Sequence, residues 1–312
     1  MFLQKLIAPW YPANALGLER GIASMVQLEG GRRNRFGLRR AASISLPDQL
    51  ITPGFDESNI ANLSELAELL RELATSAGLL RQRKWSVALP EASTRTLIIT
   101  LESQVGSKSE LEEVLKWKLE RGFGAPVEEL SVSRDRLSDD SQGRDRYIAV
   151  AVRAAVMAEY ESVFGALEWR TGLILPRHMG EACWLTNNGN AGDSLLLSSH
   201  DAGFTAVIYR NKQPLILRSI TCEADEREDE LFRLLLFYRD RLTGADAPQS
   251  LSRLLVLGNG FSRRRAGEIA GETLGLSVKT LGAEDIGLRL PASDLSFDSI
   301  AAPAGLATLH WA

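Results

Sequence analysis

The strongest constraint on the fold is an order of secondary-structure elements that is predicted twice along the chain of 312 residues. Each time, three short apolar runs separated by glycine or polar turn residues are followed by helical patterns and further strands. The first set of runs lies within residues 15–46 and the second within residues 194–219. Only the order of the elements repeats, and the two sets show no similarity of sequence residue by residue. This order predicts an α/β fold built from two halves of the same design.

The first half contains an extra stretch of chain with its own helices and strands. Asn62 and Glu65 have the spacing of a helix N-cap and its capping box, and Ser109 and Glu112 repeat that spacing. The second of these helices is expected to end at the glycines of residues 122–124. Strand patterns and a predicted hairpin accompany the two helices. The stretch therefore predicts an α+β domain inserted into the first half.

These patterns divide the chain into four parts. Residues 1–12 form an apolar N-terminal segment, which is too short to cross a bilayer and lacks a cleavage site for secretion. We interpret it as an amphipathic segment that packs on the domain, with contact to a membrane surface as the alternative. The first half comprises residues 13–60 and 154–190, the inserted domain residues 61–153, and the second half residues 191–312.

Composition excludes several classes of function. The chain has 36 basic and 40 acidic residues, and its formal charge of −4 argues against a nucleic-acid-binding surface over the whole protein. Its two cysteines and three histidines are too few for a zinc site and have no ligand spacing. We expect no metal site, and we interpret these residues as packing residues: Cys183, Cys222, His178, His200 and His310.

Five short phrases, in their order and spacing, resemble the PilM family of type IV pilus assembly. They are Gly-Leu-Glu-Arg-Gly-Ile at residues 17–22, Val-Ala-Leu-Pro at 87–90, the strand at 215–220, Leu-Gly-Asn-Gly at 257–260 and Ala-Gly-Leu-Ala at 304–307. The pattern is also similar to the cytoplasmic domain of the type II secretion protein GspL, and FtsA is a further relative. The resemblance implies an actin-like (ribonuclease H-like) duplicated fold. In this fold ATP binds between the halves.

The resemblance also implies a lid subdomain in the second half, and the sequence departs from it there. After the strand that ends near residue 220, the chain passes almost directly into a long predicted helix. Residues 221–230 carry six carboxylates, which suit the first turn of a helix. We therefore expect the lid to be reduced or missing.

The resemblance places a nucleotide site at Glu19 and Gly21 of the first turn and at Gly258 and Gly260 of the third. Glu19 stands where the family has Asp. The family's hydroxyl residue is replaced by Ile22, and its lysine and its second-turn glycine are also replaced. We expect the site to be degenerate, with no catalytic residue and no cofactor; binding of Mg-ATP is the alternative.

The expected function is that of a cytoplasmic adaptor, peripheral at the inner membrane. We expect a degenerate ATPase fold without enzymatic activity. The resemblance implies that it binds the cytoplasmic tail of a PilN-like membrane protein in a groove beside the inserted domain. Candidate groove residues are Val87, Leu89, Pro90 and Pro126, with core packing as the competing interpretation. Other pilus-platform or motor ATPase components are further expected partners, and homo-oligomers are left open. An ATP-binding regulatory switch and a GspL-like secretion component are the alternative functions.

Overall fold

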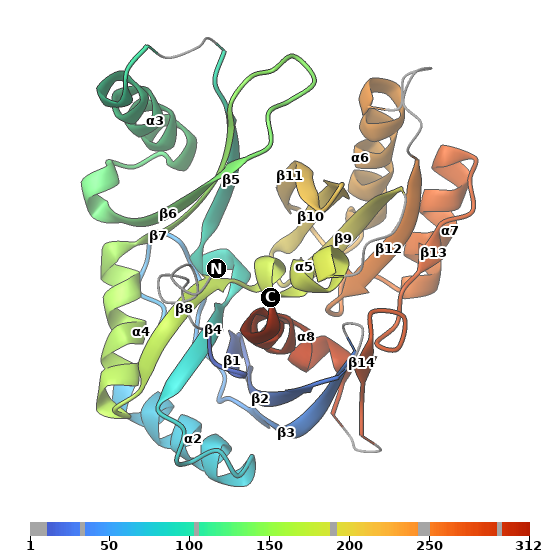
Figure 1. Cartoon of the computed structure of the whole chain (residues 1–312). Coiled ribbons are helices and arrows are strands. Elements are labelled where there is room, and N and C mark those ends of the chain that lie inside the picture. Colours follow the sequence, from blue (N-terminus) through green and yellow to red (C-terminus); the bar gives the residue numbers. More distant parts are fainter. Residues whose placement is uncertain (1–10, 32–34, 103–105, 188–191, 243–249, 292–294) are drawn as a thin grey trace.

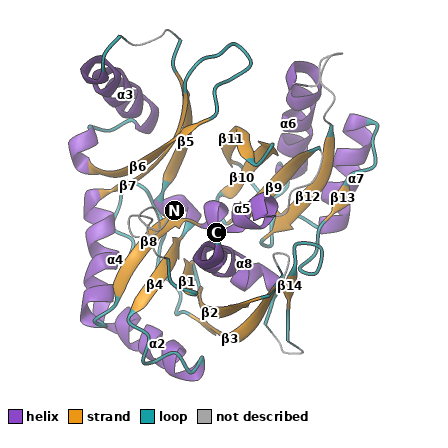
Figure 2. Cartoon of the chain, in the orientation of Figure 1, coloured by secondary structure: helices purple, strands orange, loops and turns teal. Residues whose placement is uncertain are grey.

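The computed structural model describes residues 11–31, 35–102, 106–187, 192–242, 250–291 and 295–312. It contains three β-sheets, with helices between and around them (Figures 1 and 2). The N-terminal segment predicted for residues 1–12 lies almost entirely outside the described residues. No helix in the described part of the chain is long and apolar enough to span a membrane.

The first half is built on a six-stranded sheet. Its first three strands form the predicted antiparallel meander, and two later strands join them in parallel. The strand order is β14 (Leu288–Arg289), β3 (Phe36–Ser45), β2 (Ile22–Gly30), β1 (Asn14–Glu19), β4 (Lys84–Leu89) and β8 (Arg170–Pro176). Helices α2 (Leu63–Ser76) and α4 (Ala154–Ala166) pack on one face of this sheet.

The second half repeats this plan with a five-stranded sheet. Its order is β11 (Gln213–Thr221), β10 (Gly203–Arg210), β9 (Asp193–His200), β12 (Leu251–Leu257) and β13 (Lys279–Thr280). Helices α6 (Arg227–Leu242) and α7 (Arg263–Leu274) cover its outer face. Only residues 222–226 separate β11 from α6, so the described chain has no lid subdomain at this point.

Two helices fill the space between the sheets. Helix α5 (Arg177–Asn187) and helix α8 (Phe297–Thr308) share one apolar cluster with residues from both sheets (Figure 1). They pack closely, because a Cβ on Gly305 would collide with the carbonyl oxygen of Gly180. Successive β4 residues face opposite clusters, with Val87 in the outer one and Ala88 in the central one. The sheet is therefore buried on both faces.

The inserted domain is smaller than the sequence predicts. It contains a three-stranded antiparallel sheet of order β5 (Arg95–Thr100), β7 (Arg146–Arg153) and β6 (Leu130–Leu137), with helix α3 (Lys108–Phe123) packed against it. The boundary predicted at residue 61 is too early, since α2 and β4 belong to the first-half core. The insertion begins after Leu89, and a short 3₁₀ helix, η1 (Glu91–Ser93), leads into it.

The boundary of the second half also needs correction at its C-terminal end. Strand β14 pairs with β3 of the first-half sheet, and α8 packs on β1, β2 and β4. Residues 288–312, which are predicted from sequence to belong to the second half, therefore complete the first half. The helical nature of α8 was not predicted; Pro303 lies inside it.

The two helix caps predicted from sequence have different outcomes. Asn62 caps α2, and its side chain accepts a hydrogen bond from the Glu65 backbone N–H, as predicted. For α3 the N-cap is Ser107, which accepts from the Glu110 N–H, so the prediction of Ser109 is wrong by two residues. Each serine precedes a glutamate by three residues, and the two choices are equivalent in local sequence.

Candidate functional site between the two halves

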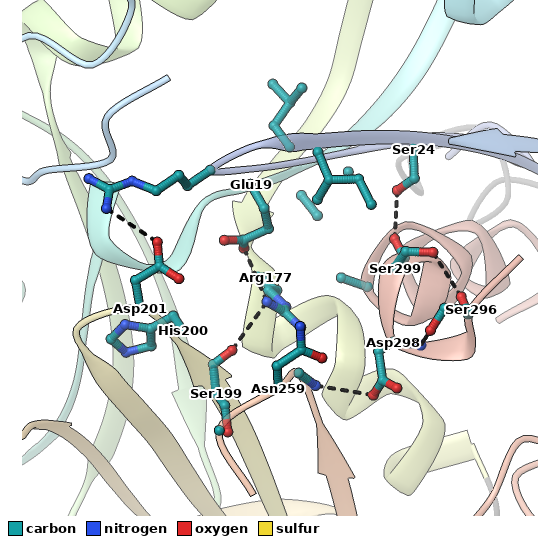
Figure 3. Close-up of a pocket in the computed structure, with 18 of the residues that line it drawn as sticks. Glu19, Ser24, Arg177, Ser199, His200, Asp201, Asn259, Ser296, Asp298 and Ser299 are labelled. Atoms are coloured by element: carbon teal, nitrogen blue, oxygen red, sulfur yellow. Dashed lines mark hydrogen bonds and ion pairs between the residues drawn. The ribbon is translucent and has the colours of Figure 1, made fainter. Parts of the chain in front are cut away.

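A cavity of about 450 Å³ lies where three turns meet between the halves (Figure 3). Glu19 and Arg20 contribute from the end of β1, and residues 199–201 from the β9–β10 hairpin. The turn at residues 258–260, after β12, forms a further wall. The N-terminal part of α8 and Arg177 of α5 complete the lining. The cavity therefore joins elements that are far apart in the sequence.

Glu19 faces a buried cation inside this cavity. Its Oε1 atom lies 3.6 Å from Nη1 of Arg177 and makes no hydrogen bond. Burial raises the pKa of the Glu19 carboxyl to about 7, and the positive charge of Arg177 only partly opposes this effect. Glu19 is therefore a carboxyl group that changes its protonation near neutral pH.

Arg177 is held by more than Glu19. Its Nε donates to Glu181 one helical turn further along α5, at 2.7 Å, and Nη1 donates to the Ser199 carbonyl at 3.2 Å. Glu181 is fully buried, and burial raises its pKa against the effect of the arginine. The guanidinium group thus connects the first half, α5 and the second-half hairpin.

An internal carboxylate lies at the third turn. The backbone N–H of Gly258 donates to Asp298 Oδ1 at 3.1 Å, and Arg263 Nη2 lies 2.9 Å from Asp298 Oδ2. Ser296 caps α8 by accepting from the Asp298 N–H. The glycine turn therefore directs an amide toward an anion that the chain itself supplies.

Arg227, at the first position of α6, closes the opposite side of this turn. Its Nη2 donates to the carbonyl oxygens of His200 and Asp201 at 2.9 and 3.1 Å. A Cβ on Gly260 would collide with Nη1 of Arg227 and with the side chain of Ser199. Only a glycine fits at residue 260 in this arrangement.

A second buried network lies beside the cavity. Glu91 follows β4, and its carboxylate lies 2.7 Å from His178 Nδ1 and accepts from the Thr205 hydroxyl at 2.7 Å. Although burial opposes ionisation, the charge and hydrogen bond of His178 and the Thr205 hydroxyl lower the pKa of Glu91 to about 2. His178 is therefore an electrostatic partner of Glu91, in addition to the packing role predicted for it.

The structure brings together three of the four predicted nucleotide-site residues. Glu19, Gly258 and Gly260 line the cavity. Gly21 does not; it forms the β1–β2 turn with φ of +73°. Asp201, which occupies the position of a family glycine, lines the cavity and lies 3.3 Å from Arg20 Nη1.

The predicted groove residues are not gathered in one place. Val87 and Leu89 are about 1% exposed or less and belong to the first-half core, and Pro90 is also buried. The prediction that they line a peptide groove is wrong because strand β4 is covered on both faces. Pro126 is exposed, at the start of the 3₁₀ helix η2 (Val127–Glu129) that leads into β6.

Sequence reasoning missed the arginines and Asp298. Two local signals were available. Arg177 and Glu181 have the i, i+4 spacing of an ion pair on an otherwise apolar helix, and Arg227 is the lone basic residue among the acidic residues 221–230. Neither signal says which cavity the side chain reaches, because the partners lie on other elements.

The two halves of like topology, the inserted domain and the cavity between them define an actin-like fold. Among solved structures, the chain is similar to one described as the PilM-PilN type IV pilus biogenesis complex, with a TM-score of 0.75 and 19% identity, covering 97% of this chain and 99% of that one. It is also similar to the cytoplasmic domain of EpsL, an inner-membrane component of the type II secretion system of Vibrio cholerae (TM-score 0.48, 13% identity, 96% and 93% coverage). No family model and no curated protein matches the sequence. The expected resemblance to PilM is confirmed at the level of the fold.

The residues present do not fit Mg-ATP. A Mg²⁺ ion bound with a nucleotide is usually held by one or two carboxylates together with waters and phosphate oxygens, whereas Glu19 is shifted toward its protonated form and faces the guanidinium group of Arg177. At the third turn, the amide of Gly258 already donates to Asp298. Within the described residues, no cluster of three or more His, Cys, Asp or Glu side chains could hold a metal ion.

Proposed function

We propose that this protein is an adaptor of a pilus assembly platform, which binds the cytoplasmic tail of a PilN-like membrane protein and does not hydrolyse ATP. The observation that carries the proposal is the similarity of fold, along nearly the whole of both chains, to a structure described as the PilM-PilN type IV pilus biogenesis complex. The paired charges of the cavity support the proposal that the protein does not hydrolyse ATP. A hydrolytic site needs a positioned water and groups that stabilise transition-state charge, whereas Glu19 and Arg177 face each other.

The inserted domain offers a site for an extended peptide. Strand β6 is an edge strand, with β7 as its only neighbour in the three-stranded sheet. An edge strand presents backbone groups to which a peptide strand can add. Pro126, the one predicted groove residue that is exposed, lies just before η2 and this edge. We place the tail along β6.

A binding experiment with a synthetic tail tests the adaptor function. The peptide would carry the N-terminal cytoplasmic residues of the PilN-like protein from the same organism, and a scrambled peptide is the control. We expect saturable binding of the native peptide and slower hydrogen exchange of the β6 amides in the complex. If the folded protein bound none of these tails, the adaptor function would be refuted. Protection confined to other strands would refute the β6 placement alone.

The lack of a Mg-ATP site is tested separately. A thermal-shift titration would compare ATP with Mg²⁺ and ATP with EDTA. We expect no stabilisation that depends on Mg²⁺. Stabilisation by several degrees with Mg-ATP, and not with ATP in EDTA, would favour the regulatory switch instead.

A further inference from the structure

We propose that the cavity between the halves binds a tetrahedral oxyanion, of the phosphate or sulfate type, without a metal ion. The guanidinium groups of Arg227 and Arg177 would hold the anion beside the turn at residues 258–260. This inference is independent of the adaptor function, because it concerns the cavity and not the inserted domain.

The first argument is the isolated charge of Arg227. The residue is 9% exposed, and its Nη2 donates to the carbonyl oxygens of His200 and Asp201. Its Nε atom is buried and makes no hydrogen bond. Among the described residues, no carboxylate lies within ion-pair distance of it. Burying an arginine without an opposite charge is unfavourable, and an anion in the cavity would remove this penalty.

The second argument is the position of the two arginines around one glycine turn. A Cβ on Gly258 would lie 3.3 Å from Nη2 of Arg177, and a Cβ on Gly260 would collide with Nη1 of Arg227. The two guanidinium groups therefore lie at the two ends of the turn. The fork of N–H groups on an arginine matches the oxygens of a phosphate or sulfate group. No metal is needed to bring positive charge to this place.

The third argument is the charge balance of the remaining lining. Arg20 lies 3.3 Å from Asp201, and both side chains are more than half exposed at the mouth of the cavity. Arg177 has Glu19 and Glu181 as partners, and Asp298 has Arg263. When these ion pairs are counted, Arg227 is the cation of the described lining that has no carboxylate within ion-pair distance. The cavity has room for one anion beside it.

Glu19 couples this binding to pH. Its carboxyl lines the cavity, and burial raises its pKa to about 7. An incoming anion would favour the protonated form further, so binding should strengthen as the pH falls below 7. Protonation would also leave Arg177 with one fewer negative partner. The charged groups that act on Glu19 are Arg177, Glu91, Glu181 and Asp201.

The test is a sulfate titration in EDTA, because sulfate does not itself titrate between pH 6 and pH 8. Binding would be followed by calorimetry and by the melting temperature, against chloride at equal ionic strength. We expect saturable binding at millimolar sulfate that is stronger at pH 6 than at pH 8. Phosphate and AMP, run in parallel, distinguish a free anion from a phosphate carried on a nucleoside.

Three variants sharpen this test. Arg227→Gln should weaken sulfate binding at least about tenfold, the loss expected for a charge-assisted contact. Glu19→Gln should retain binding and lose most of its pH dependence. Arg264→Gln removes an arginine that is outside the cavity and 89% exposed, and it should bind like the wild type.

Equal sulfate binding in Arg227→Gln and Arg264→Gln would overturn the proposal. The same holds if sulfate and chloride act alike on the wild type, a comparison that needs no variant to fold. A linear, unsaturable rise of melting temperature with sulfate would indicate general salting-out and would also overturn it. Peptide binding by the same samples reports on the adaptor function separately.

Discussion

Two glutamates at the ends of neighbouring strands have opposite protonation behaviour. Glu19 ends β1, and Glu91 follows β4, which is the parallel neighbour of β1. Burial acts to raise the pKa of both carboxyls. The pKa of Glu91 is nevertheless lowered to about 2, whereas that of Glu19 is raised to about 7. The difference lies in the charges and the hydrogen-bond donors that surround each carboxylate.

Glu91 is surrounded by donors, and Glu19 is not. Glu91 accepts from the Thr205 hydroxyl, lies 2.7 Å from His178 Nδ1, and also accepts from the His178 backbone N–H at 3.2 Å. Glu19 has one cation at 3.6 Å and a buried oxygen without a hydrogen bond. A satisfied buried carboxylate acts as a fixed connection between the halves. An unsatisfied one can respond to pH or to a ligand, and this favours Glu19 as the functional residue.

The largest effect on stability is expected when Arg177, the cation that faces Glu19, is removed. Arg177→Met leaves the fully buried Glu181 without its partner. Breaking such a buried pair typically costs about 3–5 kcal/mol. We expect a loss of that order in the free energy of unfolding, measured by urea denaturation at pH 7.

A double variant provides the control for this prediction. Arg177→Met combined with Glu181→Leu replaces the pair by apolar side chains, and it should recover much of the lost stability. Arg264→Met, at an exposed pair, should leave the stability nearly unchanged. If the single variant at residue 177 were no less stable than Arg264→Met, the charge of Arg177 would have no structural role.

The next largest effect on the free energy of unfolding is expected for Glu91, and it depends on pH. Because its folded-state pKa lies below the ordinary glutamate value of 4.5, its contribution to stability is present above pH 4.5 and is lost as the pH falls through about 2. Glu91→Gln removes this contribution and should lower the free energy of unfolding at pH 7 by about 3 kcal/mol.

Denaturant unfolding between pH 7 and pH 2 would measure this effect. The wild type should approach the stability of Glu91→Gln as the solution becomes acidic, and the two curves should be well separated at pH 7. A constant difference at every pH would mean that the variant disturbs packing and that the ionised carboxylate contributes nothing.

Local features of the fold were predictable from sequence, and contacts between distant segments were not. The strands of both meanders and the Asn62 cap follow from patterns a few residues long. Strand β4 was assigned to the inserted domain because its pairing with β1 is a long-range contact. The same limit hid β14 and the packing of α8 against the first-half sheet.

The candidate site shows this limit most clearly. Glu19 and the glycines of the third turn were found because a resemblance placed them. The resemblance predicts that a family hydroxyl is lost at Ile22 and a family lysine at Val26. Cations nevertheless enter the cavity from α5 and α6, as Arg177 and Arg227. A side chain that reaches a site from another element leaves no spacing in the sequence. Only the tertiary structure identifies it.

The smallest effect, and one of opposite sign, is expected for Glu19→Gln. The folded-state pKa of Glu19 is raised from 4.5 to about 7, so the stability that the protonated carboxyl contributes is complete below pH 4.5 and is lost as the pH rises through 7. Glutamine resembles the protonated form at every pH. The variant should match the wild type near pH 4.5 and exceed it at pH 8. The shift alone would give about 3 kcal/mol, and the side chain's 21% exposure reduces the expected gain to roughly 1–2 kcal/mol.

Measuring the free energy of unfolding from pH 4.5 to pH 8 tests the contrast between the two glutamates directly. Asp201→Asn is the matched control, because Asp201 lines the same cavity in an exposed ion pair, and its removal should change stability by at most about 1 kcal/mol at any pH. A Glu19→Gln variant that is less stable than the wild type at pH 8 would show that the ion pair with Arg177 outweighs the burial of the carboxylate. Glu19 would then be a structural residue like Glu91. A gain that grows as the pH rises from 4.5 to about 7 would instead identify Glu19 as the group in the cavity that changes its charge near neutral pH.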